Sequence, residues 1–121
     1  MRHAGQVAIL RFPHADLALG KPRPVLLITS VPGPYQDWLV CMISTQLQQA
    51  VEQFDEVLSQ DQPDFPISGL KVPSVIRIAR LAVVAADSLV GAVGEIGPER
   101  LQKIRDKIAN WIQGTIPVVQ S

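Results

Sequence analysis

An arginine fixed between two prolines is the first feature of this sequence that suggests chemistry. Residues 20–29 read GKPRPVLLIT, so Arg23 stands between Pro22 and Pro24, directly before an apolar run typical of a buried strand. Arginine carries a planar fork of donors that matches phosphate oxygens, and the prolines reduce the conformational freedom that it loses on binding. The arrangement fits a phosphate site. It also fits an arginine that forms a salt bridge with a surface carboxylate.

Two hydroxyl groups at the end of another apolar run extend this candidate site. Residues 38–44 (WLVCMIS) predict a strand that ends at Ser44, and Thr45 follows directly. If this strand pairs antiparallel with the strand that follows Arg23, the beginning of one strand lies beside the end of the other. Arg23 and Ser44 would then meet at one edge of the sheet. An arginine and a hydroxyl there suit the stabilisation of a pentacovalent phosphorane.

Other reactive residue types offer less. The sequence contains no glycine-rich phosphate loop, no Cys/His cluster at metal-ligand spacing and no serine in a nucleophile-elbow pattern. His14, in the proline-containing loop of residues 13–22, is either a surface residue or a substrate-contacting acid or base. The single cysteine, Cys41, is expected to be a small buried hydrophobe. The remaining candidates are arginines and hydroxyls, and they include Arg77 and Arg80 on a later predicted strand.

Length and composition predict one soluble domain. The chain has 121 residues, of which 47% are apolar and 18% charged, enough to bury a core without disulfides or metal. No apolar run approaches the roughly 18 residues of a membrane span, and the N-terminus lacks a secretory pattern. With only one cysteine, these features predict a cytoplasmic protein without membrane contact.

The charges balance at eleven basic and eleven acidic residues, which removes the simplest electrostatic argument for a nucleic-acid partner. Residues 52–64 nevertheless hold five acidic residues and no Lys or Arg, so the rest of the molecule has an excess of positive charge. A local basic surface is therefore compatible with the sequence. We interpret the acidic stretch itself as a solvated loop and strand edge.

Six short segments are predicted to be strands. Between them, the stretch after Thr45 fits a helix by propensity or a loop followed by a strand by alternation, and we favour the second. Residues 61–69, with two prolines and a glycine, predict a connection. In residues 74–81, Val75, Arg77 and Ala79 alternate with Ile76, Ile78 and Arg80. The predicted strands are residues 6–12, 25–30, 38–44, 54–58, 74–81 and 89–96.

One helix is predicted after the last strand. Pro98 suits a first helical position and Gly114 suits the C-terminal stop. Leu101, Ile104, Ile108 and Trp111 recur at the spacing of one apolar face, which predicts packing against the sheet. Short strands with one late helix favour a mainly β fold, a small antiparallel barrel or curled sheet with helical additions.

Four motifs in order resemble the MazF/PemK family of toxin endoribonucleases from toxin-antitoxin pairs. They are GQVAILRFPHADLALGKPRPVLLIT, LVCMISTQ, GLKVPSVIRIARL and VGEIGPERLQKI. The resemblance covers about residues 5–112, so residues 113–121 would form a C-terminal tail of a single domain spanning residues 1–121. It implies the SH3-like barrel of the MazF/CcdB type. It also implies a homodimer that cuts single-stranded RNA without a metal or cofactor and is inhibited by a cognate antitoxin.

The resemblance assigns roles to individual residues. Arg23 falls on the catalytic arginine of the family and Ser44 on the catalytic threonine, with Thr45 as the neighbouring hydroxyl. In one branch of the family an aspartate acts two residues after an arginine, and here Arg77 matches that arginine while Ala79 stands in the aspartate position. The residues expected to contact RNA are His14, Lys21, Gln46, Arg77 and Arg80.

A second interpretation keeps the fold and changes the function. The departures at Ser44 and Ala79 are compatible with a catalytically weakened binding module. Such a protein would act by contact with a protein, either an antitoxin or a target comparable to the DNA gyrase that related toxins poison.

Overall fold

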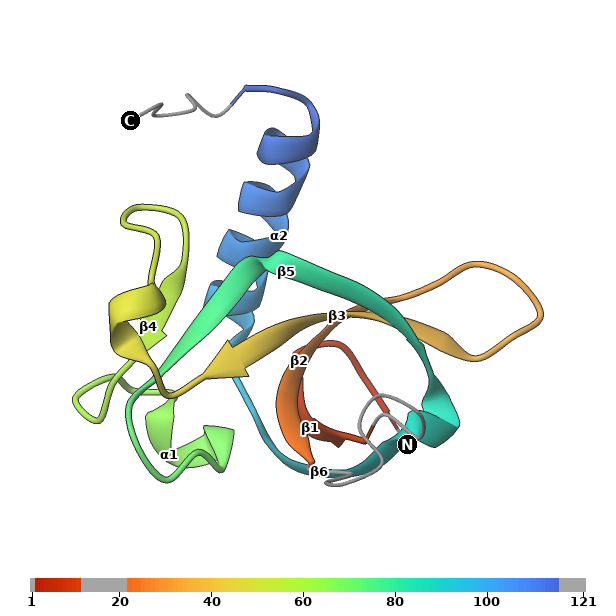
Figure 1. Ribbon diagram of the computed structural model, residues 1–121, viewed down its shortest axis with the longest axis horizontal. Helices are drawn as coiled ribbons and strands as arrows, with labels where there is room; N and C mark the ends of the chain where they lie inside the picture. Colours follow the sequence, from red (N-terminus) through yellow and green to blue (C-terminus); the bar gives the residue numbers. More distant parts are fainter. Residues whose placement is uncertain (1, 12–21, 116–121) are drawn as a thin grey trace.

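The strands form a single curled sheet. The computed structural model describes residues 2–11 and 22–115, and within these residues six antiparallel strands follow the order β4-β5-β3-β2-β1-β6 (Figure 1). The mainly β fold predicted from the sequence is confirmed. The strands are β1 (Gln6–Leu10), β2 (Arg23–Ser30), β3 (Asp37–Ser44), β4 (Glu56–Leu58), β5 (Ser74–Ala85) and β6 (Leu89–Glu95).

The ambiguous segment after Thr45 is a loop followed by a strand, as favoured from the alternation. The loop contains the 3₁₀ turn η1 (Leu47–Gln49) and leads to β4. The connection predicted for residues 61–69 contains a short helix, α1 (Phe65–Ser68), which ends at Gly69 with φ +74°. A second 3₁₀ turn, η2 (Ala86–Ser88), separates β5 from β6.

Helix α1 lies directly against the edge strand β6. A Cβ atom added to Gly94 of β6 would stand 2.3 Å from the carbonyl oxygen of Ile67 and 2.3 Å from the carbonyl carbon of Ser68. A Cβ atom on Gly69 would stand 2.2 Å from the carbonyl oxygen of Val93. The two glycines thus allow backbone-to-backbone contact between the β4–β5 connection and β6, and this contact helps the curled sheet to enclose its core.

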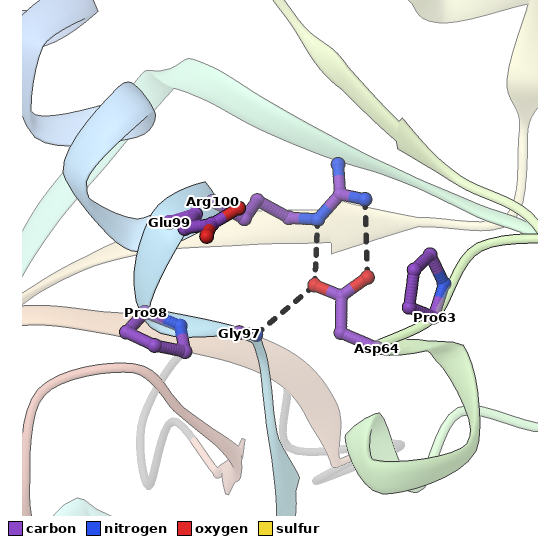
Figure 2. A pocket seen from close by; sticks show the side chains of 6 residues that line it. All are labelled: Pro63, Asp64, Gly97, Pro98, Glu99 and Arg100. Atoms are coloured by element: carbon purple, nitrogen blue, oxygen red, sulfur yellow. Dashed lines mark hydrogen bonds and ion pairs between the residues drawn. The ribbon is translucent and has the colours of Figure 1, made fainter.

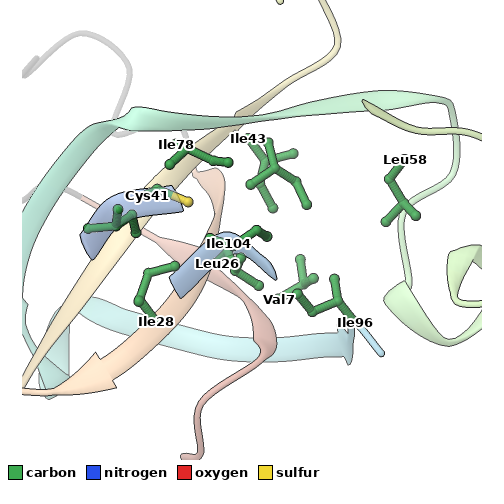
Figure 3. Packing of buried hydrophobic residues seen from close by; sticks show 11 residues of the cluster. Val7, Leu26, Ile28, Cys41, Ile43, Leu58, Ile78, Ile96 and Ile104 are labelled. Carbon is green, nitrogen blue, oxygen red and sulfur yellow. The ribbon is translucent and has the colours of Figure 1, made fainter. Parts of the chain in front are cut away.

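The sheet is apolar on both faces. Side chains of successive residues in β2 alternate between two buried clusters, so Val25, Leu26, Leu27 and Ile28 are all buried. The first cluster, shown in Figure 3, is built around Leu26, Cys41, Ile76, Ile78 and Ile104. The second cluster contains Ala8, Leu10, Val25, Leu27, Val40, Val84 and Leu89. Cys41 is fully buried, as expected, and burial raises the pKa of its thiol to about 12.

Helix α2 (Pro98–Ile112) covers the face of the first cluster. Ile104 and Ile108 are buried there and Leu101 packs beside them, while the Trp111 ring meets Phe54 edge to face with centroids 5.9 Å apart. The helix begins at Pro98, and Gly114 follows its end with φ +75°, a conformation that glycine adopts without strain. The predicted start, stop and apolar face are confirmed.

Strand β5 is longer than predicted and carries a pronounced bulge. Its pairing with β3 changes from Cys41–Leu81 to Met42–Arg77, which leaves Ile78, Ala79 and Arg80 as three extra residues on β5. The N–H of Ile78 donates to the Asp55 carboxylate at 3.0 Å instead of to a strand neighbour. The alternation predicted for residues 74–81 therefore holds for Ile76 and Ile78 and fails beyond them, where Ala79 and Arg80 are both exposed.

Neither helix of residues 2–11 and 22–115 combines the length and the apolar character needed to cross a bilayer.

Candidate functional site

Arg23 and Ser44 stand in one row of residues across the sheet. Strand β2 pairs antiparallel with β3, with Val25 opposite Met42. Continuing this register by two residues puts Arg23 opposite Ser44, as expected from the strand order. The same row extends to Leu10 of β1, which pairs with Arg23, and to Val75 of β5, which pairs with Ser44. We call Leu10, Arg23, Ser44 and Val75 the site row.

Arg77 lies in the neighbouring row of the same face. That row runs from Ala8 through Val25 and Met42 to Arg77, with each residue paired to the next. Paired residues and residues two apart in a strand share a face, so Arg23, Ser44 and Arg77 all lie on the face of the second cluster. Ser44 and Arg77 are diagonal neighbours on adjacent strands, a relation in which residues are about 7–8 Å apart. Arg23 lies one strand further from Arg77.

The guanidinium of Arg77 has a buried donor whose hydrogen bond is not satisfied by the described residues. Its Nε is shielded from solvent, and no described residue accepts a hydrogen bond from it. Buried donors are nearly always paired in proteins, because an unpaired donor costs about 1–3 kcal/mol. Arg23, by contrast, is exposed at the rim of the sheet. The two arginines give this end of the face guanidinium donors for an anion.

The hydroxyl of Ser44 is held in place by the turn that follows it. Its Oγ accepts the backbone N–H of Gln46 at 3.0 Å and donates to Oε1 of Gln49 at 3.1 Å. Thr45 is exposed, and Gln46 is exposed with its Oε1 accepting a hydrogen bond from Gln48 at 2.8 Å. Of the two hydroxyls considered from the sequence, Ser44 is thus the one in the row of Arg23.

The structure does not fix the remaining predicted contacts relative to the site row. Arg80 lies in the bulge of β5 and is exposed, so the register does not fix its position relative to the site row. His14 and Lys21 lie outside the described residues. Among the described residues, no group of three or more His, Cys, Asp or Glu side chains could hold a metal ion.

A second polar cluster lies on the opposite face of the sheet. Glu56 pairs with Ile76 of the first cluster and meets α2, where Oε1 of Glu56 is 2.8 Å from Nη1 of Arg100 and Oε2 is 2.6 Å from Nζ of Lys107. Arg100 also binds Asp64 through Nε at 2.8 Å and donates to Gln62. We call Glu56, Gln62, Asp64, Arg100 and Lys107 the ion-pair cluster. Lys103, 3.4 Å from Glu56, lies at its exposed margin.

The ion-pair cluster corrects the interpretation of residues 52–64 as a solvated stretch. Glu56 and Asp64 are only 6% and 8% exposed. Burial by itself would raise the pKa of Glu56, but the hydrogen bond from Lys107 and the charges of Lys107, Lys103 and Arg100 outweigh it and lower that pKa. The pKa of Asp64 is lowered mainly by its hydrogen bond from Arg100. Arg100 and Lys107 are therefore paired with these carboxylates inside the fold and do not contribute to a free basic surface.

A hollow of about 280 Å³ opens beside this cluster, between residues 63–64 and the start of α2 (Figure 2). One carboxylate oxygen of Asp64 accepts the N–H of Gly97 at 3.0 Å and the Nε of Arg100, and the other oxygen accepts from Nη2 of Arg100 at 3.1 Å. Because three hydrogen bonds already hold the carboxylate, we interpret the hollow as a by-product of an anchoring contact. It offers little for a reaction.

Sequence reasoning missed Gln49 and the ion-pair cluster. A signal for the cluster was present, because Arg100, Lys103 and Lys107 recur at helical spacing and an acidic stretch without basic residues precedes them. Gln49 had no comparable signal, since its contact depends on how η1 folds back towards Ser44.

These features define a class of small curled-sheet proteins with a helix on one face, and the sequence identifies the family. Residues 3–112 match the model of the PemK-like, MazF-like toxins of type II toxin-antitoxin systems, so the chain belongs to that family. The predicted family is confirmed. A comparison with curated proteins finds no match.

Solved structures support the fold. An endoribonuclease in complex with its cognate antitoxin, from a mycobacterial species, aligns with a TM-score of 0.66 at 16% identity over 97% of this chain and 100% of that one. The Mycobacterium tuberculosis toxin MazF-mt6 aligns with a TM-score of 0.64 at 19% identity, over 89% and 96% of the two chains. A MazE-MazF structure from Deinococcus radiodurans gives 0.65 at 18% identity, over 95% and 97%.

Proposed function

We propose that this toxin is a metal-independent endoribonuclease that cleaves single-stranded RNA. The observation that carries the proposal is the placement of Arg23, Ser44 and Arg77 in adjoining rows on one face of the sheet. The Nε of Arg77 supports it, because this donor has no hydrogen-bond partner among the described residues and a phosphate oxygen would satisfy it. Membership of the MazF-like family supports the same activity.

The reaction proposed is attack by the ribose 2′-hydroxyl on the adjacent phosphorus. The bond between the 2′-oxygen and phosphorus forms as the bond to the 5′-oxygen of the next nucleotide breaks, which leaves a 2′,3′-cyclic phosphate and a 5′-hydroxyl. One proton leaves the 2′-oxygen and one reaches the departing 5′-oxygen, and water can carry both. Arg23 stabilises the negative charge of the phosphorane, a role that suits the charged donors of a guanidinium.

RNA and antitoxin are proposed to share this surface. His14, Lys21, Gln46, Arg77 and Arg80 contact the RNA strand, whose bases are read while unpaired. The antitoxin lays an extended C-terminal segment over the same surface, and the toxin works as a homodimer. Support for the antitoxin comes from two structural neighbours, an endoribonuclease in complex with its cognate antitoxin and a MazE-MazF structure.

Cleavage of single-stranded RNA in the presence of EDTA tests the activity. Wild type is expected to cut, and Arg23→Ala is expected to lose about 10²–10³-fold in kcat, the usual effect of removing a donor to a transition-state oxyanion. Arg11→Ala is the matched control, because it removes an exposed arginine outside the site row. Absence of cutting by wild type, or equal cutting by wild type and Arg23→Ala, would overturn the assignment.

Growth arrest separates this function from action by protein contact. Expression of wild type is expected to arrest growth, and Arg23→Ala is expected to relieve the arrest. Toxicity that persists in Arg23→Ala would instead favour the binding module, whose departures from the family pattern are Ser44 and Ala79. Relief of the growth arrest by Arg11→Ala but not by Arg23→Ala would contradict both the nuclease and the binding module.

A further inference from the structure

The hydroxyl of Ser44 is fixed by two hydrogen bonds that come from a single turn. The N–H of Gln46 donates to Oγ at 3.0 Å, and Oγ donates to Oε1 of Gln49 at 3.1 Å. The turn is itself closed by two backbone bonds, from the N–H of Gln49 to Gln46 at 2.9 Å and from the N–H of Ala50 to Leu47 at 3.1 Å. The turn thereby brings the side chain of Gln49 back to Ser44, five positions earlier in the sequence.

These bonds determine what Ser44 can offer to a substrate. A serine hydroxyl has one proton and two acceptor lone pairs. Gln49 takes the proton and the N–H of Gln46 takes one lone pair, so one lone pair remains. Ser44 can therefore act towards a substrate only as a hydrogen-bond acceptor, whereas Arg23 and Arg77 carry only donors.

We propose that Gln49 is a positioning residue that makes Ser44 an acceptor for the ribose 2′-hydroxyl. This inference rests on the proposed ribonuclease function and assigns the residues different roles in it. The arginine donors suit phosphate oxygens, whereas the 2′-hydroxyl needs an acceptor to orient its proton. A serine lacks the β-methyl that limits the rotamers of threonine. The bond to Gln49 supplies the missing restraint, and RNA is selected over DNA at the same point.

Substitutions at Gln49 test this role through kcat and KM for single-stranded RNA. Gln49→Leu is expected to lower kcat about tenfold and to leave KM within about twofold, because the chain still binds RNA but Ser44 turns freely. Gln48→Leu is the matched control, since Gln48 lies in the same turn and contacts Gln46 rather than Ser44. Gln49→Glu is expected to keep kcat, since a carboxylate also accepts the proton, and to raise KM by charge repulsion.

A second substitution shows whether the restraint is rotameric. In Ser44→Thr/Gln49→Leu the loss of kcat relative to Ser44→Thr is expected to shrink to about twofold, because the β-methyl of threonine limits χ1 without help. A wild-type kcat in Gln49→Leu, or an equal loss in Gln49→Glu and Gln49→Leu, would overturn the inference while the nuclease function stands. A wild-type chain that cuts no RNA would remove the function and this inference together.

Discussion

Arg100 and Asp64 form a two-point ion pair, with Nε 2.8 Å from Oδ2 and Nη2 3.1 Å from Oδ1. The remaining nitrogen of the guanidinium, Nη1, lies 2.8 Å from Glu56. One arginine of α2 thus connects the helix with β4 and with the connection that leads to α1. Because the side chains of Arg100, Asp64 and Glu56 are shielded from water, loss of this ion pair is expected to reduce stability more than loss of a surface salt bridge.

Loss of Arg100 should destabilise the fold strongly. Arg100→Gln leaves Glu56 and Asp64 buried with reduced compensation, so the free energy of unfolding is expected to fall by about 3 kcal/mol. Lys103→Gln is the control, because Lys103 is 62% exposed and 3.4 Å from Glu56, and its loss is expected to cost less than about 0.5 kcal/mol. Urea denaturation measures both, and equal losses would contradict the central role of Arg100.

Acid should destabilise the fold by protonating carboxylates of the ion-pair cluster. The pKa values of Glu56 and Asp64 are lowered in the fold, so the unfolded chain binds more protons than the folded chain in the acid range. The stability that these carboxylates contribute is fully present above their unfolded pKa values, about 4–4.5, and is lost as the pH falls towards the lowered folded values. Melting temperatures measured between about pH 7 and pH 3 should fall more steeply for wild type than for Arg100→Gln. Parallel curves would exclude these carboxylates as the cause.

Close contact at β6 predicts a difference between two glycines of one strand. In Gly94→Ala the new methyl would meet backbone atoms of Ile67 and Ser68 at 2.3 Å, so α1 must move and about 3 kcal/mol of stability is expected to be lost. Gly91→Ala is the control, because a methyl group added there would have no neighbouring atom within 4 Å. Thermal unfolding compares the two variants. Similar melting temperatures would mean that α1 can move away from β6 with little loss of stability.

The predictable parts of this fold are those with local causes. Apolar runs in residues 25–30 and 38–44 predicted β2 and β3, and Pro98 with Gly114 marked the ends of α2, because each signal is contained in the element or directly beside it. The bulge after Arg77 is not local, since it depends on the carboxylate of Asp55 accepting the N–H of Ile78. The alternation in β5 therefore failed at Ala79 and Arg80.

The same distinction applies to the site. The antiparallel pairing of β2 with β3 was predictable from the sequence order, and extending its register by two residues from the Val25–Met42 pair puts Arg23 opposite Ser44. The position of Arg77 in the next row requires the register across the bulge. The contact of Gln49 with Ser44 requires the geometry of a three-residue turn, which propensities do not specify.

Arg77 should show a trade between stability and binding. Its Nε has no partner within residues 2–11 and 22–115, which costs stability in the free protein, so Arg77→Met is expected to leave the free energy of unfolding unchanged or to raise it by about 1 kcal/mol. Affinity for single-stranded RNA is expected to fall about tenfold and to depend less on salt, because one phosphate contact is lost. Lys71→Met, which removes an exposed charge outside the proposed site, is the control. A clear loss of stability in Arg77→Met would indicate that the guanidinium already has a partner in the free protein.

The hydroxyls of Ser44 and Thr45 should contribute very differently to the rate of RNA cleavage. Ser44→Ala removes the hydroxyl opposite Arg23 and is expected to lower kcat for single-stranded RNA by at least about tenfold, the effect of one hydrogen bond worth about 1.4 kcal/mol in the transition state. Thr45→Val keeps the shape of an exposed side chain next to the site row and is expected to change kcat less than about twofold. Loss in the second variant alone would mean that the reacting register is shifted by one residue, onto the other face of β3, since successive residues of a strand face opposite ways. Loss in both variants would show that RNA reaches across the end of β3, with Ser44 and Thr45 acting from its two sides.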